Sequence, residues 1–240
     1  MLIAPPFLAV SPWQFKDMNE ANSNSNSWVE YSDTLFDYRF RDAINTVKPD
    51  IIEILTWNDY AESHYIRDLP PTSGPASLQL NAQGNYVYGM DHSAWRIIAQ
   101  YYISWYKSGQ PPAITKDRVV FWYRTHPKAA TCSGGANASP AVRNSNYPAD
   151  AVFAWALVSA PSTISMSVGS NQYWSFSASQ SGPVLNMVPF PSNLGNGVYP
   201  MVGIMRNGVT VQAGNGSVPI TQACSWENFN AVVALAGPGL

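Results

Sequence analysis

Residues 51–65 read IIEILTWNDYAESHY, and this stretch decides the fold. An apolar, β-branched run from Ile51 to Leu55 changes at Thr56 into a segment with two carboxylates, an amide and aromatic rings. A buried strand that ends in a polar loop of this kind is how an α/β barrel presents catalytic groups at its C-terminal face. We therefore predict that Asp59 and Glu62, the acidic pair of this loop, are catalytic carboxylates.

The residues before this stretch predict a strand and a helix. Leu2–Val10 is apolar and predicts a buried strand, whereas Lys16–Ser27 is rich in Asn and Ser and predicts an exposed loop. Asp33 is predicted to cap a helix that runs to about Val47 with its apolar positions on one face, and Pro49 ends it. A strand, a helix and a second, continuously apolar strand follow one another in the order typical of a parallel sheet.

The residues after the stretch predict a loop and a second helix. Leu69–Asn85 is rich in Pro, Gly and Ser, and it is either an active-site loop or a spacer. The segment Ala94–Lys107 carries large apolar side chains at spacings of three and four, a pattern typical of a helix packed on a core. Residues 108–112, SGQPP, stop this helix and form a linker. Residues 1–112 are thus predicted to be an α/β unit.

From Asp117 onward the apolar residues recur with a period of two, which is typical of β-strands. Asn207-Gly208 is a hairpin turn signal between two of these segments. Short strands at this spacing predict an antiparallel β-sandwich, an accessory domain over residues 113–240. The predicted strands are 118–126, 151–158, 162–170, 172–179, 183–190, 199–208, 209–214 and 228–235.

The composition limits the partners of the chain. The 240 residues are 46% hydrophobic and only 12% charged, with a net charge of −2, so nucleic acid is excluded as a partner. No apolar run is long enough to cross a bilayer, and the apolar N-terminus lacks the basic residues of a signal peptide. A chain that starts on a core strand is expected to continue something longer.

Two cysteines, Cys132 and Cys224, are either buried thiols or a disulfide that joins the start of the second half to its end. The disulfide is the favoured alternative. Asn137 and Asn215 each begin an N-glycosylation sequon, which agrees with a secreted origin. Together these features predict a secreted, extracellular protein.

Three motifs resemble the fungal α-1,3-glucanases (mutanases) of glycoside hydrolase family 71. AVSPWQF at 9–15 is close to the family's PVSPWF, and EILTWNDYAESHYI at 53–66 is close to its TWNDYGESHYI. DRVVFWYRTHPKAA at 117–130 is similar to the segment that follows the family's barrel. The resemblance extends over essentially all of the chain, but it maps onto the C-terminal part of the family's chain.

The resemblance implies that residues 1–109 are the last two βα units of a (β/α)8 barrel whose earlier units are absent. It also implies that Asp59 and Glu62 are the catalytic pair of an inverting glycosidase. Inversion requires a carboxylic acid that protonates the leaving oxygen and a carboxylate that activates a water, with the two carboxyl groups roughly 6.5–9.5 Å apart. We expect Glu62 to be the acid and Asp59 the base, although the sequence leaves the order open. Ala61 stands where the family has glycine, so this position is less free to adopt a positive φ.

Six further residues are predicted to bind the sugar, each with a structural alternative. Indole faces pack against pyranose rings, and polar side chains in the loop can bind hydroxyl groups. Burial in the core is the alternative for the aromatic residues. The candidates are Trp13, Trp57, Asn58, His64, Tyr65 and His92. The spacing of the three histidines does not match a zinc site, and no cofactor or metal is expected.

Two functions of different classes follow. The first is hydrolysis of an α-1,3-glucan polysaccharide or oligosaccharide of the fungal cell wall. The second is a non-catalytic carbohydrate-binding or structural remnant of such an enzyme, inactive because most of the barrel is absent. A lectin-like role would rest on the sandwich alone, and a fold does not establish a function. The unpaired edges of a partial barrel also predict that the chain forms a homo-oligomer or is completed by other segments.

Overall fold

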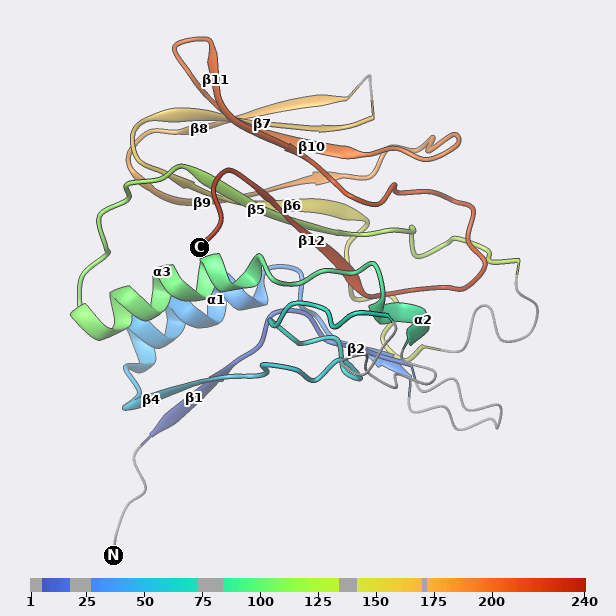
Figure 1. Ribbon diagram of the computed structural model, residues 1–240, viewed down its shortest axis with the longest axis horizontal. Coiled ribbons are helices and arrows are strands. Elements are labelled where there is room, and N and C mark those ends of the chain that lie inside the picture. Colours follow the sequence, from blue (N-terminus) through green and yellow to red (C-terminus); the bar gives the residue numbers. More distant parts are fainter. Residues whose placement is uncertain (1–5, 18–26, 73–83, 134–141, 170–171) are drawn as a thin grey trace, which may run out of the picture.

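The computed structural model describes residues 6–17, 27–72, 84–133, 142–169 and 172–240. The described elements stack in layers (Figure 1): an outer antiparallel sheet, a second antiparallel sheet, two helices and a small parallel sheet. The start of the first predicted strand, most of the predicted loops at 16–27 and 69–85, and the sequon at Asn137 lie outside the described residues.

The small parallel sheet pairs β1 (Phe7–Val10) with β4 (Ile51–Ile54), in a register that places Phe7 opposite Ile51. Between them lie α1 (Leu35–Asp42) and a π-helical turn (Ala43–Val47), so the predicted strand–helix–strand order is present. The prediction that the second strand is buried throughout was wrong. Ile51 is 51% exposed and Glu53 is exposed, whereas Ile52 and Ile54 pack on the core. Of the described strands, only β1 pairs with β4, so side chains alternate between the core and solvent, and no barrel is closed.

The predicted cap of the first helix was also wrong. Thr34 occupies the N-cap position without a side-chain cap. Asp33 instead accepts hydrogen bonds from two distant segments, at its side chain from the Ala149 N–H (2.9 Å) and at its carbonyl from the Trp122 indole (2.9 Å). The carboxylate therefore ties α1 to the β-sheet half of the chain.

The second predicted helix is α3 (Trp95–Ser108), and it ends as expected. Gly109 adopts a φ of 72° and donates its N–H to the Trp105 carbonyl (2.8 Å). A short helix, α2 (Gly84–Val87), precedes it, and β2 (Phe15–Lys16) pairs with β3 (Trp28–Val29) near the end of β1.

The prediction of antiparallel β-structure after residue 112 is confirmed. One sheet has the order β12-β5-β6-β9 and the other β11-β10-β7-β8. Asn207 and Gly208 both have positive φ, as the hairpin between β10 and β11 requires. The strands are β5 (Arg118–Arg124), β6 (Ala151–Val158), β7 (Ser162–Val168), β8 (Tyr173–Ala178), β9 (Gly182–Pro189), β10 (Pro200–Arg206), β11 (Val209–Asn215) and β12 (Ala231–Ala236).

The sheet that contains β5 and β6 is covered on both faces, and every residue of these two strands is buried. Trp122 and Trp155 belong to the hydrophobic cluster that includes α1 and α3. Phe121 and Ala154, on the opposite face, belong to the cluster shared with the outer sheet. The first cluster thus contains side chains from before and after residue 112 in the sequence. The division into two domains at this position stays a prediction.

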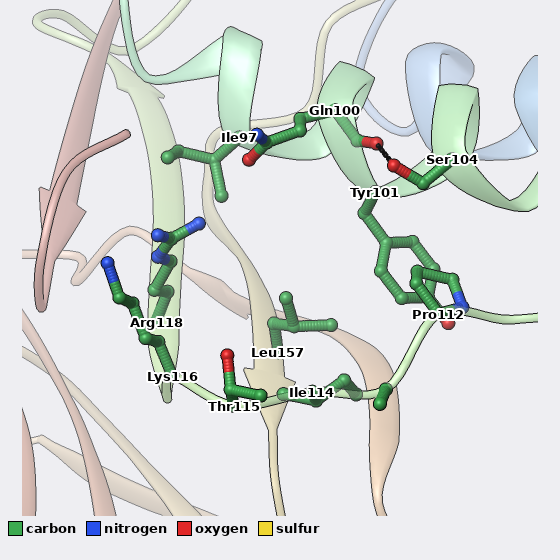
Figure 2. A pocket seen from close by; sticks show the side chains of 11 residues that line it. Ile97, Gln100, Tyr101, Ser104, Pro112, Ile114, Thr115, Lys116, Arg118 and Leu157 are labelled. Carbon is green, nitrogen blue, oxygen red and sulfur yellow. Dashed lines mark hydrogen bonds between the residues drawn. The ribbon is translucent and has the colours of Figure 1, made fainter.

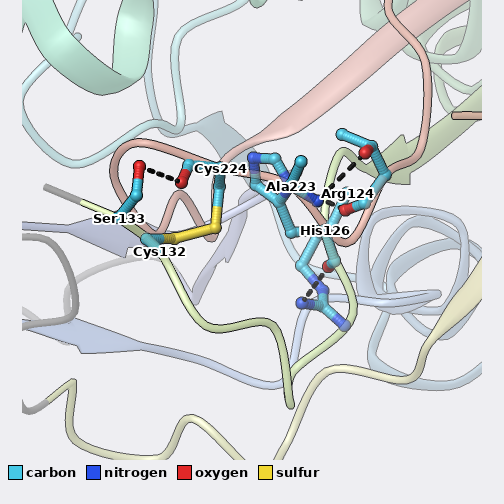
Figure 3. The surroundings of a disulfide bond; sticks show 7 residues. Arg124, His126, Cys132, Ser133, Ala223 and Cys224 are labelled. Carbon is cyan, nitrogen blue, oxygen red and sulfur yellow. Dashed lines mark hydrogen bonds between the residues drawn. A yellow bond between two sulfur atoms is a disulfide. The ribbon is translucent and has the colours of Figure 1, made fainter. Parts of the chain in front are cut away.

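Cys132 and Cys224 form a disulfide that bridges 92 positions of sequence (Figure 3). The Ser133 N–H donates to the Cys224 carbonyl (2.9 Å), so the two segments also touch through their backbones. Among the described residues, no helix combines the length and the apolar character needed to cross a membrane.

Candidate active site

The acidic loop begins at the carboxyl end of β4, beside the carboxyl end of β1. The Leu55 N–H donates to the Val10 carbonyl (2.9 Å), and the peptide bond from Leu55 to Thr56 is cis. Thr56 then closes the loop. Its N–H donates to the His64 carbonyl (2.9 Å), and its carbonyl accepts the Ile66 N–H (3.1 Å). These backbone bonds hold residues 56 to 66 as a compact loop with a fixed base.

The two acidic residues are held by bonds within this loop. The Asp59 N–H donates to Thr56 Oγ1 (2.9 Å), and Asp59 Oδ1 accepts the Glu62 N–H (3.1 Å). The Glu62 carbonyl accepts the Phe15 N–H (3.1 Å), which ties the loop to β2. Both carboxylates remain partly exposed, so solvent and a ligand can reach them.

His64 brings the two carboxylates together. Its Nε2 atom lies 3.3 Å from Asp59 Oδ2 and 3.4 Å from Glu62 Oε2, while Nδ1 lies 3.4 Å from Ser11 Oγ. Lys16 Nζ approaches the other Glu62 oxygen at 3.3 Å. At least one Asp59 carboxylate oxygen lies within 4.8 Å of a Glu62 carboxylate oxygen. This separation is shorter than the distance between carboxyl groups expected for an inverting enzyme.

Trp57 and Asn58 point away from the core at the start of the loop. Trp57 is 54% exposed, and Asn58 is also exposed. An indole face that is open to solvent, in the same loop as two carboxylates, is available for a pyranose ring. The sugar-binding roles of Trp57 and Asn58 stay predictions.

Trp13, Tyr65 and His92 do not fit their predicted roles as sugar-binding residues. Trp13 is 1% exposed, and its indole donates to the Phe229 carbonyl (2.9 Å). Tyr65 and His92 are both 0% exposed, and their rings stack with centroids 4.1 Å apart. These three side chains are buried beneath the loop, because a segment far along the chain covers them.

This covering segment is the start of β12 and the residues before it. The His92 ring contacts the Tyr65 and Ala231 carbonyls (3.2 and 2.9 Å), and Asn230 Nδ2 donates to the Tyr65 hydroxyl (3.3 Å). Burial lowers the pKa of His92 to about 4, against the smaller effect of the carbonyl of Ala231. Burial likewise raises the pKa of Tyr65. The buried His92–Tyr65 pair therefore supports the loop and stays neutral near pH 7.

Three further residues, Ser11, Lys16 and Tyr86, lie near the acidic pair, and none of them was predicted. Ser11 follows β1 directly, and Lys16 belongs to β2. Because the carboxyl ends of parallel strands meet at one edge of a sheet, the position of Ser11 after the first strand could have identified it. Tyr86 donates its hydroxyl to the Ala61 carbonyl (2.6 Å) and has no signal in the sequence. Burial, with the nearby charges of Asp17, Asp59 and Glu62, raises the pKa of the Tyr86 hydroxyl, whereas a bond to the backbone of Asp17 acts against it.

The positive φ in the loop falls on Ser63 (61°) rather than on Ala61. The Ser63 hydroxyl is buried and has no hydrogen-bond partner in the described part of the chain. The loop therefore accommodates alanine at position 61 without strain.

A cavity of about 290 Å³ lies between α3 and the segment that leads into β5 (Figure 2). Gln100 and Ser104 of α3 line one side, and Thr115, Lys116 and Arg118 line the other. Neither acidic residue nor any predicted sugar-binding residue belongs to its lining. We place the candidate site at the acidic loop because its two carboxylates can donate and accept protons at a glycosidic bond. No pair of carboxylates lines the cavity.

Comparisons with known proteins agree with the three motifs. The profile of glycosyl hydrolase family 71 matches residues 4–238. A mutanase of Penicillium rubens is 32% identical over 231 residues, which are 93% of this chain and 46% of the relative. A glucan endo-1,3-alpha-glucosidase of Schizosaccharomyces pombe is 33% identical over 223 residues, 92% of this chain and 48% of the relative. The chain thus spans about half the length of these curated relatives, and no solved structure matches it significantly.

Proposed function

Since the chain belongs to glycosyl hydrolase family 71, we propose that it carries the acid–base pair of an enzyme that hydrolyses α-1,3-glucan. The observation that carries the proposal is the convergence of Asp59 and Glu62 in the loop that follows β4. Both carboxylates are partly exposed, and the same loop holds an exposed Trp57. The names of the two relatives support an α-1,3-glucan as the substrate class.

The proposed reaction is an inverting hydrolysis. Glu62 donates a proton to the glycosidic oxygen as the bond from the anomeric carbon to that oxygen breaks. Asp59 takes a proton from a water that attacks the anomeric carbon from the opposite face. The Asp59 carboxylate is held within the loop by the Glu62 N–H, whereas the Glu62 carboxylate is held from outside the loop by Lys16. For a water to fit between them, Glu62 must swing away from His64 when the sugar binds.

The roles of the two carboxylates can be separated with an activated substrate. Asp59→Asn keeps an acceptor for the Glu62 N–H, so the fold persists while the base is lost. Glu62→Gln should lower the rate on glucan but retain activity on a glucosyl fluoride, whose leaving group needs little protonation. Asp59→Asn should lower both rates, by about 10²–10⁴-fold. The reverse pattern would exchange the two roles, and unchanged release by both variants would exclude the assignment.

We also propose that β1, α1, β4 and α3 correspond to the last two βα units of a (β/α)8 barrel, with residues 113–240 as a β-sandwich accessory domain. The parallel pairing of β1 with β4 and the position of α1 and α3 on one side of them support the barrel assignment. The disulfide supports a secreted origin. Among the described strands, only two form the parallel sheet, so its edges are open. Open edges support the proposal that the chain associates with a second copy of itself or with further segments.

The open parallel sheet also favours the second candidate function, a non-catalytic carbohydrate-binding remnant. The protein is incubated with insoluble α-1,3-glucan, and both bound protein and released reducing ends are measured. If reducing ends are released and the Asp59→Asn variant releases none, hydrolysis is supported. Binding without release supports the remnant.

A further inference from the structure

A buried guanidinium lines the cavity of about 290 Å³ between α3 and residues 112–118 (Figure 2). Arg118 is 9% exposed, and the second cationic residue of the lining, Lys116, is exposed. No carboxylate belongs to the lining. We propose that this cavity binds a small carboxylate of the size of a single sugar acid, with its carboxylate group on Arg118.

The first argument is the unused hydrogen-bonding capacity of Arg118. A guanidinium carries five N–H donors. In the described part of the chain, Arg118 donates from Nη2 to the Gly239 carbonyl (3.0 Å), and its buried Nε has no partner. Figure 2 shows the guanidinium directed toward the wall of the cavity that α3 forms. A buried donor without an acceptor is unfavourable, and a ligand with acceptor oxygens would satisfy it.

The second argument is that no described residue balances the charge of Arg118. Arg124, the other buried arginine among the described residues, pairs with Asp150. Asp117 is adjacent to Arg118 in the sequence, but its carboxylate accepts from Arg206 and Ser159. Burial lowers the pKa of the Arg118 guanidinium, and no charge on a described residue opposes this effect. A buried cation without an anion is unfavourable, so an anionic ligand fits this end of the cavity.

The third argument concerns the kind of anion and its size. A guanidinium matches a carboxylate with two parallel hydrogen bonds. One buried cation balances one negative charge, which favours a carboxylate over a phosphate group of charge near −2. A volume of about 290 Å³ lies at the lower end of the range for small-molecule sites, so the cavity suits one ring with its substituents.

The rest of the lining suits an uncharged, hydroxylated body. Ile97 and Leu157 are buried and supply apolar surface. The Ser104 hydroxyl donates to the Gln100 carbonyl (2.8 Å), so its oxygen remains able to accept a bond from a ligand hydroxyl. The side chains of Gln100 and Thr115 are exposed and lie at the mouth of the cavity, where they can bond further hydroxyl groups.

The cavity is separate from the acidic loop, so this inference goes beyond the proposed function. Neither Asp59 nor Glu62 belongs to the lining. Lys116 lies at the mouth, where its ammonium attracts an anion without being buried with it. Loss of Lys116 should therefore weaken binding less than loss of Arg118.

The experiment measures the melting temperature and the heat of binding of the full chain with sodium glucuronate. Glucose and inorganic phosphate are the comparisons. A 100-fold excess of glucuronate over its Kd should raise the melting temperature by roughly 5–10 °C, and glucose should leave it unchanged. Arg118→Met should weaken binding at least about 10-fold, because hydrogen bonds to a charged group are lost. Lys116→Met should weaken it by about 2–5-fold, as expected for an exposed ion pair.

Arg96→Met is the matched control, because Arg96 lies on the same helix, pairs with Asp68 and does not line the cavity. This variant and Asp59→Asn should both bind glucuronate as the original protein does. If Arg118→Met does not fold, Lys116→Met and the comparison with glucose still decide. The proposal is overturned if glucuronate neither binds nor stabilises the protein, or if Arg118→Met binds it equally well. It is also overturned if glucose or phosphate binds at least as tightly, or if Arg96→Met or Asp59→Asn abolishes binding.

Discussion

Replacing both cysteines by serine should destabilise the protein strongly, because the disulfide closes a loop of 92 positions. In the chain-entropy treatment, opening a loop of this length returns about 15.6 cal/mol/K to the unfolded chain, or about 4.6 kcal/mol at 25 °C. A domain typically has only about 5–15 kcal/mol of stability, so this loss is a large fraction of the total. For a chain of this size it corresponds to a fall in melting temperature of roughly 9–18 °C.

The bridge also acts on the region beneath the acidic loop. Cys224 leads into Trp226, whose ring stacks on Tyr86 with centroids 5.8 Å apart, and Tyr86 bonds the Ala61 carbonyl. The loop has its own backbone bonds at Thr56, however. We therefore expect Cys132→Ser/Cys224→Ser to keep the loop folded below its new melting temperature and to lose stability rather than local structure.

The assay is thermal and urea unfolding of the original protein and of the double variant, each with and without dithiothreitol. Reductant should lower the melting temperature of the original protein to that of the double variant and leave the variant unchanged. A fall of less than about 3 °C in the double variant would refute the reasoning, since the loop-closure treatment predicts at least three times as much.

Three further predictions test the positions of individual side chains. Trp57→Ala should weaken glucan binding in a pull-down without changing the melting temperature, because Trp57 is exposed. Trp13→Ala should instead lower the free energy of unfolding in urea by about 3–5 kcal/mol, because Trp13 is buried. Burial alone would raise the pKa of Asp117, but bonds from Arg206 and Ser159 outweigh it and hold that pKa below its ordinary value. The stability from this pair is present above about pH 4 and is lost as the pH falls through the lowered pKa. Asp117→Asn should therefore destabilise the protein more at pH 7 than at pH 2, as measured by urea unfolding at each pH. Ser63→Gly should raise the free energy of unfolding by about 0.5–1 kcal/mol, because it relieves a positive φ and removes a buried, unpaired hydroxyl; a lower urea midpoint would contradict this.

Much of the architecture could be predicted because it depends on local patterns. The period of two after residue 117 identified the antiparallel strands, and Asn207-Gly208 identified a hairpin. Gly109 identified the end of α3. The burial of whole strands could not be predicted, because it depends on what covers the second face of a sheet. Both β5 and β6 are buried throughout, since α1 and α3 cover one face and the outer sheet covers the other.

The candidate site divides in the same way. The order of residue types from Trp57 to Tyr65 indicated the acidic pair as the candidate chemistry. Three motifs together predicted the family, to which the profile match over residues 4–238 assigns the chain. A short loop can position only its own members, and Asp59 indeed holds the Glu62 N–H.

The tertiary structure alone decided which neighbours are available to a ligand. Trp13, Tyr65 and His92 are polar-tipped or aromatic residues near the motif, but residues 228–231 arrive from the far end of the chain and bury them. The pairing of β1 with β4 and the bond from the Phe15 N–H to the Glu62 carbonyl bring Ser11 and Lys16 to His64 and Glu62. Local sequence determines the conformation of a segment, whereas exposure and electrostatic environment depend on contacts between segments that are distant in the chain.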